Sequence, residues 1–218
     1  PLPQDAGLDE LRLKDVPKGT VVNPGQRLNP LLHFVGRSDI AFVDTPGSTK
    51  LTDMAPYINT AVQTITSATG ELKLDYGKGV LTVNAAKAQG VSGLVRSAGD
   101  ISTRDLSISS DMELGHILAV SLDDQPLASS GKILLQVMSE EKESNRQVET
   151  AGDKKTLVNI GADPWLVKEL NGLVKFKRAD AATLKAVALD FNGYPVSAAG
   201  TADKIVLQPN TLYYLISR

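Results

Sequence analysis

The sequence predicts an all-β protein, an antiparallel β-sandwich or jelly roll with little helix. Many short segments alternate apolar and polar residues, and turn signals recur roughly every 8–12 residues, as they do in β-sandwiches. No long segment sustains apolar residues at positions i, i+3 and i+4, which argues against a mainly helical fold.

The first clear strands lie within Thr69–Gly93, which is expected to form a hairpin followed by an extended stretch. In "ELKLDY", Leu72 and Leu74 point to one side, while Lys73 and Asp75 point to the other. The turn "YGKG" then leads into a second strand, "VLTVN".

The later strands follow the same logic. "ISTRDLSIS" alternates, whereas "GHILAVSL" and "KILLQVM" are rich in apolar residues, which is typical of strands buried on both faces. In "GLVKFKR", Val174 and Phe176 alternate with lysines, and "TLKAVALD" continues the pattern. Asn192-Gly193 predicts a type I′ hairpin turn. The last two strands flank Pro209-Asn210, and the apolar segment Leu212–Ile216 is expected to pair inside a sheet.

The chain is expected to divide into a Pro/Gly-rich lead-in or wrapping segment, residues 1–56, and a β-sandwich module, residues 57–218. The lead-in is expected to hold short strands at Gly19–Val22, His33–Val35 and Ile40–Val43. A helical turn is expected in "LTDMAPYINTAVQTI", with Ser48 or Thr49 as its cap.

The polar stretch Ser139–Lys155 is expected to form a loop. It is either a solvated, mobile loop or one at the edge of the sandwich that contacts a ligand or a partner domain.

Composition narrows the classes of function. The net charge of −2 argues against a nucleic-acid partner, because binding to phosphates needs a basic surface. The chain has no cysteine, so disulfides, thiolate metal sites and cysteine nucleophiles are excluded. Its apolar runs are too short to span a membrane. Because the chain starts at Pro1 rather than Met, we expect a mature or trimmed fragment.

The sequence shows no catalytic set, so no catalytic residue is predicted. Its two histidines, His33 and His116, fit packing or structural roles better than a Ser-His-Asp triad, and no G-x-S-x-G elbow occurs. The adjacent acids Asp123-Asp124 and Glu140-Glu141 are typical of solvated loops. The sequence contains no cofactor-binding or metal-binding pattern, and it does not decide whether a structural Ca²⁺ is bound.

Exposed aromatic rings are the remaining binding signal, because a flat ring can stack on the apolar face of a sugar. Trp165 sits in "GADPWLVKEL", a segment expected to be turn-like, where it either plugs one end of the sandwich or forms a stacking platform. Tyr76 in "DYGKG" and Tyr194 in "NGYP" are weaker candidates of the same kind. The predicted carbohydrate-binding residues are therefore Trp165, Tyr76 and Tyr194.

Several longer stretches resemble a known type of module: "TGELKLDYGKGVLTVNAAKAQG", "LAVSLDDQPLASSGKILLQVMSEEKESN", "LKAVALDFNGYPV" and "LYYLISR". They resemble the β-rich module that follows the (β/α)-barrel catalytic domain in large bacterial glycoside hydrolases and related polysaccharide-degrading proteins. The resemblance covers the chain from about Tyr57 onward, and "LLHFVGRSDIAF" also fits it.

The resemblance implies a secreted or periplasmic accessory module, with a polysaccharide or oligosaccharide and an upstream catalytic domain of the same protein as partners. The acid and base of such proteins lie on the barrel, so no catalytic residue is carried over. "NAAKAQG" is smaller and less polar than expected at a ligand loop, which argues against a binding role there.

Three hypotheses follow. The first is a non-catalytic, carbohydrate-binding module of a carbohydrate-active enzyme. The second is a structural domain that docks on the catalytic barrel without binding sugar, and it predicts an exposed apolar patch. The third is a small hydrolase or lyase in its own right, which would need a cleft that gathers His33 or His116 with carboxylates and basic residues.

Overall fold

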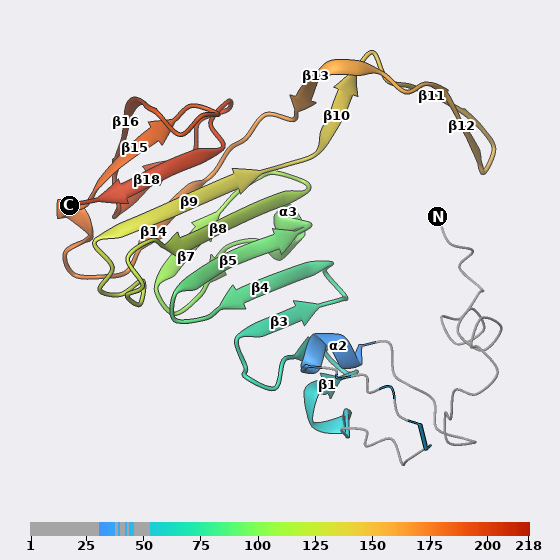
Figure 1. Ribbon diagram of the computed structural model, residues 1–218, viewed down its shortest axis with the longest axis horizontal. Coiled ribbons are helices and arrows are strands. Elements are labelled where there is room, and N and C mark those ends of the chain that lie inside the picture. Colours follow the sequence, from blue (N-terminus) through green and yellow to red (C-terminus); the bar gives the residue numbers. More distant parts are fainter. Residues whose placement is uncertain (1–30, 38, 40–41, 43, 46–52) are drawn as a thin grey trace.

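The computed structural model describes residues 31–37, 39, 42, 44–45 and 53–218 (Figure 1). The protein is mostly β-strand, 48%, with only 8% helix, and its strands form antiparallel sheets. This confirms the predicted all-β, sandwich-like fold.

Most of the strands form one large sheet. Within the described residues, 14 strands pair antiparallel in the order β1-β2-β3-β4-β5-β8-β9-β18-β15-β16-β17-β14-β7-β6. In that order they are β1 (Ile58–Asn59), β2 (Thr64–Thr66), β3 (Leu72–Asp75), β4 (Val80–Asn84), β5 (Ala88–Gly93), β8 (Gly115–Ser121), β9 (Lys132–Met138), β18 (Tyr213–Ser217), β15 (Lys185–Leu189), β16 (Pro195–Thr201), β17 (Lys204–Val206), β14 (Leu173–Phe176), β7 (Leu106–Ser109) and β6 (Ile101–Ser102).

Two further strand pairs form a projecting arm between β9 and β14 (Figure 1). They are β10 (Glu141–Ser144) with β13 (Ala162–Val167), and β11 (Gln147–Ala151) with β12 (Lys154–Asn159).

The helical elements described are single turns: α2 (Leu32–Val35), η1 (Ala55–Tyr57), α3 (Val95–Ala98) and η2 (Ala181–Thr183). None of the helices in the part of the chain described is long and apolar enough to cross a membrane.

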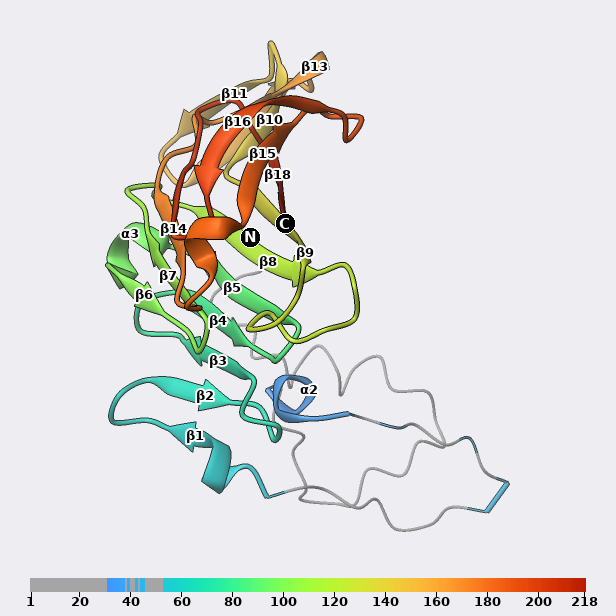
Figure 2. The same ribbon diagram turned by 90° about the vertical axis from the view of Figure 1, so that its left-hand side faces the viewer.

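The core lies inside the curl of the large sheet. Figure 2 shows the sheet bending so that β7 and β14 face β5 and β8. The enclosed side chains include Val91, Leu106, Ile117, Leu135, Val174, Phe176, Ile205, Tyr214 and Ile216, all at most 3% exposed. Burial of these side chains is the main force that holds the two halves of the sheet together.

The connections between the strands of the large sheet lie at its two opposite ends. At the arm end, β9 runs out into the arm and the chain returns to start β14. At the opposite end, which we call the clasp end, β8 turns into β9 through residues 122–131, and β18 finishes. The two ends therefore present different sets of loops.

A buried polar network closes the curl at the clasp end. Gln89 on β5 is fully buried, and its Oε1 accepts hydrogen bonds from Thr103 Oγ1 (2.7 Å) and the Asp105 backbone N–H (2.8 Å). Its Nε2 donates to Asp105 Oδ2 at 2.5 Å. Because Thr103 and Asp105 belong to the turn between β6 and β7, this network ties the edge of the sheet back to β5.

Several predictions are confirmed. The hairpin in Thr69–Gly93 forms as β3 and β4, and the stretch after it is strand β5. Val174 and Phe176 are buried while Lys175 is exposed, as the alternation predicted. The last strand, β18, pairs with β9 on one side and β15 on the other.

Other predictions are wrong in detail. His33–Val35 lies in helix α2 rather than a strand, since the amides of Val35 and Gly36 bond back to Leu31 and Leu32. A short apolar run does not distinguish the two states. "ISTRDLSIS" is a hairpin of β6 and β7 rather than one strand. "GHILAVSL" and "KILLQVM" alternate between buried and less buried residues, because only one face of β8 and β9 meets the core.

The predictions for a turn and a helical segment have different outcomes. Asn192-Gly193 does form a hairpin turn, but only Gly193 has a positive φ, +86°, so the turn is not type I′. The helical turn predicted in "LTDMAPYINTAVQTI" is confirmed as η1, and β1 and β2 follow it. The predicted strand Gly19–Val22 and the caps Ser48 and Thr49 lie outside the described residues, as does most of Ile40–Val43. The division into 1–56 and 57–218 stays a prediction.

Candidate functional site

The arm, residues Glu140–Lys168, is the most exposed part of the protein that the structure describes. The predicted loop at Ser139–Lys155 is wrong, because the stretch forms β10 and β11 and the start of β12. Every residue of β11 and β12 is exposed, so buried and exposed residues do not alternate along these strands. The polar side chains that suggested a loop are therefore those of a strand pair with solvent on both faces.

The tip of the arm has a recognisable turn. Gly152 and Asp153 form a two-residue loop between β11 and β12, and Gly152 has φ +60°. A glycine with positive φ in the first position is typical of a type II′ turn. The Gly-Asp pair, followed by the strand-forming residues of "TLVNI", is the sequence signal that could have predicted this hairpin.

The base of the arm is fixed to the body. Lys168 donates its backbone N–H to Glu140 O (2.9 Å), and its ammonium group lies 3.2 Å from Glu140 and 3.7 Å from Glu113. Ser139 Oγ donates to Lys168 O at 2.6 Å. Val167 packs against the core, and Leu170 is buried in it. The arm therefore has a defined exit direction from β9.

Large apolar side chains cover the arm, although the arm has no core of its own. The exposed ones are Val148, Leu157, Val158, Ile160, Trp165 and Leu166. Val148 lies opposite Leu157 in the register, so these two side chains share one face. Leu157 and Val158 lie on opposite faces because successive strand residues alternate, so both faces of the arm carry exposed apolar side chains. Exposed apolar surface of this kind marks interaction sites. Of these six side chains, only Trp165 is predicted from the sequence as a binding residue.

Trp165 does not lie in a turn, as predicted, but in strand β13. Its side chain is 54% exposed, so it does not plug an end of the sandwich. It lies directly opposite Glu143 on β10. Glu143 Oε2 is hidden from solvent and accepts no hydrogen bond within the described residues, and Arg146 lies 3.8 Å from it. Because Trp165 is half-exposed, its ring is accessible to a ligand or a partner.

The two tyrosine candidates lie apart from Trp165. Tyr194 follows the turn between β15 and β16 and is 68% exposed, with Phe191 and Val196 exposed beside it in sequence. Tyr76 lies in the turn between β3 and β4 and is 41% exposed. All three rings lie at the arm end of the sheet, but β3 and β15 are separated by several strands in the sheet order. The structure does not bring the three rings into one site.

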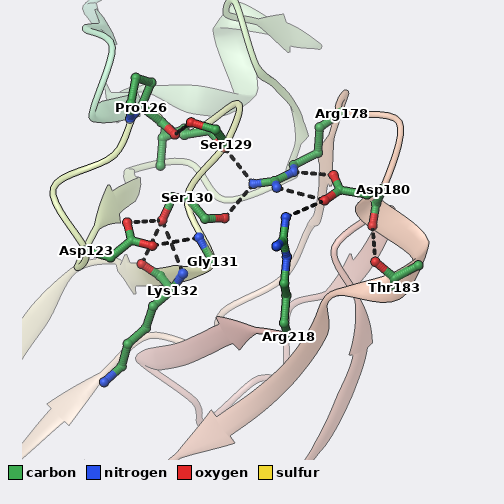
Figure 3. Close-up of polar contacts among 11 residues, drawn as sticks. Asp123, Pro126, Ser129, Ser130, Gly131, Lys132, Arg178, Asp180, Thr183 and Arg218 are labelled. Carbon is green, nitrogen blue, oxygen red and sulfur yellow. Dashed lines mark hydrogen bonds and ion pairs between the residues drawn. The ribbon is translucent and has the colours of Figure 1, made fainter.

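The clasp end carries a second cluster, shown in Figure 3. The Arg178 side chain is only 5% exposed and forms a two-pronged ion pair with Asp180, at 2.5 and 2.9 Å. Its Nη1 donates to Leu127 O and Ser130 O at 2.9 and 2.6 Å. Arg218 also reaches Asp180, at 3.3 Å. Arg178 thus joins the loop 122–131 to the segment before η2.

Asp123 connects the two ends of the loop 122–131 through hydrogen bonds. Its carboxylate accepts hydrogen bonds from Ser130 Oγ (2.7 Å), the Gly131 N–H (2.7 Å) and Ser121 Oγ (2.9 Å). The Ser130 hydrogen bond is the largest of the effects that hold the pKa of Asp123 well below its usual range. Hydrogen bonds from Arg178 lower the pKa of Asp180 to about 2. Each carboxylate is already engaged by the protein, so the cluster stabilises the fold.

The histidines do not meet the requirement of the hydrolase hypothesis in the described part of the chain. His116 Nδ1 forms a hydrogen bond with Ser92 Oγ at 2.7 Å, on an exposed sheet face, and no carboxylate bonds to it there. His33 is exposed on α2. Among the described residues, no group of three or more His, Cys, Asp or Glu side chains is arranged to hold a metal ion.

Comparisons of the chain with protein-family models, with curated proteins and with solved structures found no match.

Proposed function

We propose that the chain is a non-catalytic accessory module of a carbohydrate-active enzyme, and that its arm docks on another domain of the same polypeptide. The observation that supports docking is the set of exposed apolar side chains on the arm. Full burial of one Val, Leu or Ile side chain is worth roughly 1.5–3 kcal/mol, so covering several of them on a partner favours association. The carbohydrate-active context rests on the sequence resemblance alone.

The chemistry of the arm fits a protein partner. Acidic and basic side chains are interspersed with the apolar ones along the arm, as in Glu141-Lys142, Glu149 and Lys154-Lys155. An apolar centre with a mixed polar surround is the usual composition of a protein–protein interface. The sequence resemblance implies that the partner domain is a catalytic barrel and that the protein is secreted or periplasmic.

Hydrogen–deuterium exchange tests the docking proposal. The exchange of Gln147–Asn159 is measured in this chain alone and in the complete polypeptide that carries the catalytic domain. Docking is expected to slow exchange in the complete polypeptide, and Leu157→Asp is expected to abolish the slowing. Val206→Asp places the same charge on an exposed valine outside the arm and serves as the control. Equal exchange in both forms would overturn docking.

A second candidate function is polysaccharide binding, with Trp165 as the stacking platform. The exposure of its ring on a strand, rather than in a packed position, favours this candidate. Native affinity electrophoresis in gels that contain a panel of plant and algal polysaccharides tests it. Retardation by one glycan that is lost in Trp165→Ala, but kept in Phe191→Ala, would support binding at Trp165. Retardation that persists in Trp165→Ala would contradict it.

A further inference from the structure

A shallow groove lies on the outer face of the sheet, over β14, β7 and the start of β6. It has a volume of about 210 Å³ and is lined by Asp100, Ser107, Ser109, Leu173 and Lys175. This is smaller than the roughly 300–1,000 Å³ of most drug-sized ligand sites, so it has room for one small chemical unit.

The register of the sheet places these side chains together. Lys175 on β14 lies opposite Ser107 on β7, and Leu173 lies opposite Ser109. The alternate residues of both strands are buried in the core on the other face. The groove therefore presents two hydroxyls along one strand, beside an ammonium group and a half-buried apolar side chain on the next.

The polar groups of the groove have no partner in the part of the protein from Asp53 to Arg218. Across residues 53–218, the side chains of Asp100, Ser107, Ser109 and Lys175 form no hydrogen bond or ion pair. The neighbouring Lys177 differs, because its ammonium group donates to Ser102 Oγ and Thr103 O, both at 2.6 Å. With respect to residues 53–218, the donors and acceptors of the groove are therefore free for a ligand.

From these features we infer that the groove binds one ring of a neutral sugar. The residues that line the groove carry one positive charge, on Lys175, and one negative charge, on Asp100, so the lining itself has no net charge to select an anion. Hydroxyls, a carboxylate and an ammonium group together match a ligand that both donates and accepts hydrogen bonds. The side chain of Leu173 offers contact to the apolar face of a pyranose ring. This sugar site does not depend on docking of the arm, or on Trp165.

A titration followed by ¹H–¹⁵N correlation spectra tests the inference. The ¹⁵N-labelled chain is titrated to millimolar concentration with uncharged hexaoses of the agaro, xylo, cello and laminari series, and with inorganic phosphate. The inference expects saturable shifts of the amides of Ser107, Ser109, Leu173 and Lys175 with at least one hexaose. Loss of one hydrogen bond is expected to raise the dissociation constant about two- to tenfold in Lys175→Met. The double variant Ser107→Ala/Ser109→Ala removes two hydroxyl groups and is expected to raise the dissociation constant at least as much.

Lys185→Met is the matched control, since Lys185 is exposed on β15 outside the groove. It is expected to leave the dissociation constant unchanged, and the dispersion of each spectrum reports whether the variant is folded. The inference is overturned if no hexaose shifts the groove amides, if phosphate alone shifts them, or if shifts occur only around Trp165 and Tyr194. Failure of docking would instead appear in hydrogen exchange of the arm, so the two proposals fail separately.

Discussion

Gln89 and Asp105 lie on opposite sides of the curl of the sheet and exchange two hydrogen bonds, Nε2 to Oδ2 at 2.5 Å and backbone N–H to Oε1 at 2.8 Å. The Gln89 side chain is fully buried. Buried polar groups that satisfy each other stabilise a fold, and removal of one partner exposes the other to the full desolvation cost. This pair therefore sets the closure of the sheet at the clasp end.

We expect Gln89→Leu to lower the free energy of unfolding by about 1–3 kcal/mol, because the Asp105 amide and the Thr103 hydroxyl lose their acceptor. Urea unfolding followed by circular dichroism measures the change. Gln125→Leu is the control on the exposed loop of the clasp end and is expected to stay within about 0.5 kcal/mol of the wild type. Equal effects of both changes would contradict the closing role of Gln89.

Tyr214 provides a second internal tie. Its ring is fully buried, and its hydroxyl accepts the backbone N–H of Gln208 at 2.6 Å. Tyr214→Phe keeps the ring but leaves that N–H without its partner, so we expect a loss of about 1–2 kcal/mol in urea unfolding. Tyr213→Phe is the matched control, because the Tyr213 hydroxyl forms no hydrogen bond to residues 53–218. Similar losses in the two variants would contradict the prediction.

Tyr214 also predicts a loss of stability in alkali. Burial raises the pKa of Tyr214 above its ordinary value of 10.0. Above pH 10.0 the unfolded chain ionises this tyrosine while the folded chain still holds its proton, so stability falls as the pH rises. Urea midpoints measured on either side of pH 10.0 should fall less steeply in Tyr214→Phe than in the wild type. Identical slopes would show that other groups dominate.

For Asp180 we expect the stability of the fold to fall as the pH falls in acid. Hydrogen bonds from Arg178 lower the pKa of Asp180 from 3.8 to about 2. Its stabilising contribution is present above pH 3.8 and is lost as the pH falls towards 2, since the unfolded chain takes up the proton first. Asp180→Asn should reduce this loss, whereas Asp153→Asn, in the exposed turn of the arm, should not. A carboxyl NMR titration of Asp180 with a midpoint near 3.8 would refute the prediction.

Gly161 controls the shape of the arm. It has φ +88°, and a Cβ at this position would lie 2.7 Å from both Glu143 Cβ and Ser144 O. Gly161→Ala is therefore expected to distort the pairing of β10 with β13 and to change the fluorescence of Trp165, the only tryptophan. Gly152→Ala has a similar φ but open space around it, so it should leave the emission unchanged. Unchanged emission in both variants would contradict the role assigned to Gly161.

The parts of the fold that could be predicted are those with one buried face. Val174 and Phe176 alternate with lysines because one side of β14 meets the core and the other meets water. The arm lacks this contrast, since both faces of β11 and β12 are exposed, and its strands were therefore predicted as a loop. Trp165 was found as a candidate from its residue type, but its strand and its neighbour Glu143 were not.

By itself, the sequence determined the all-β class, the β3–β4 hairpin and the inward-facing residues of the strands with one buried face, because period-two alternation and turn residues act locally. Only the tertiary structure decided which strands become neighbours. It placed Lys175 beside Ser107, joined Gln89 to Asp105, and left the apolar side chains of the arm uncovered. These relationships depend on the order of strands in the sheet, and long-range pairing leaves no periodic trace in one chain.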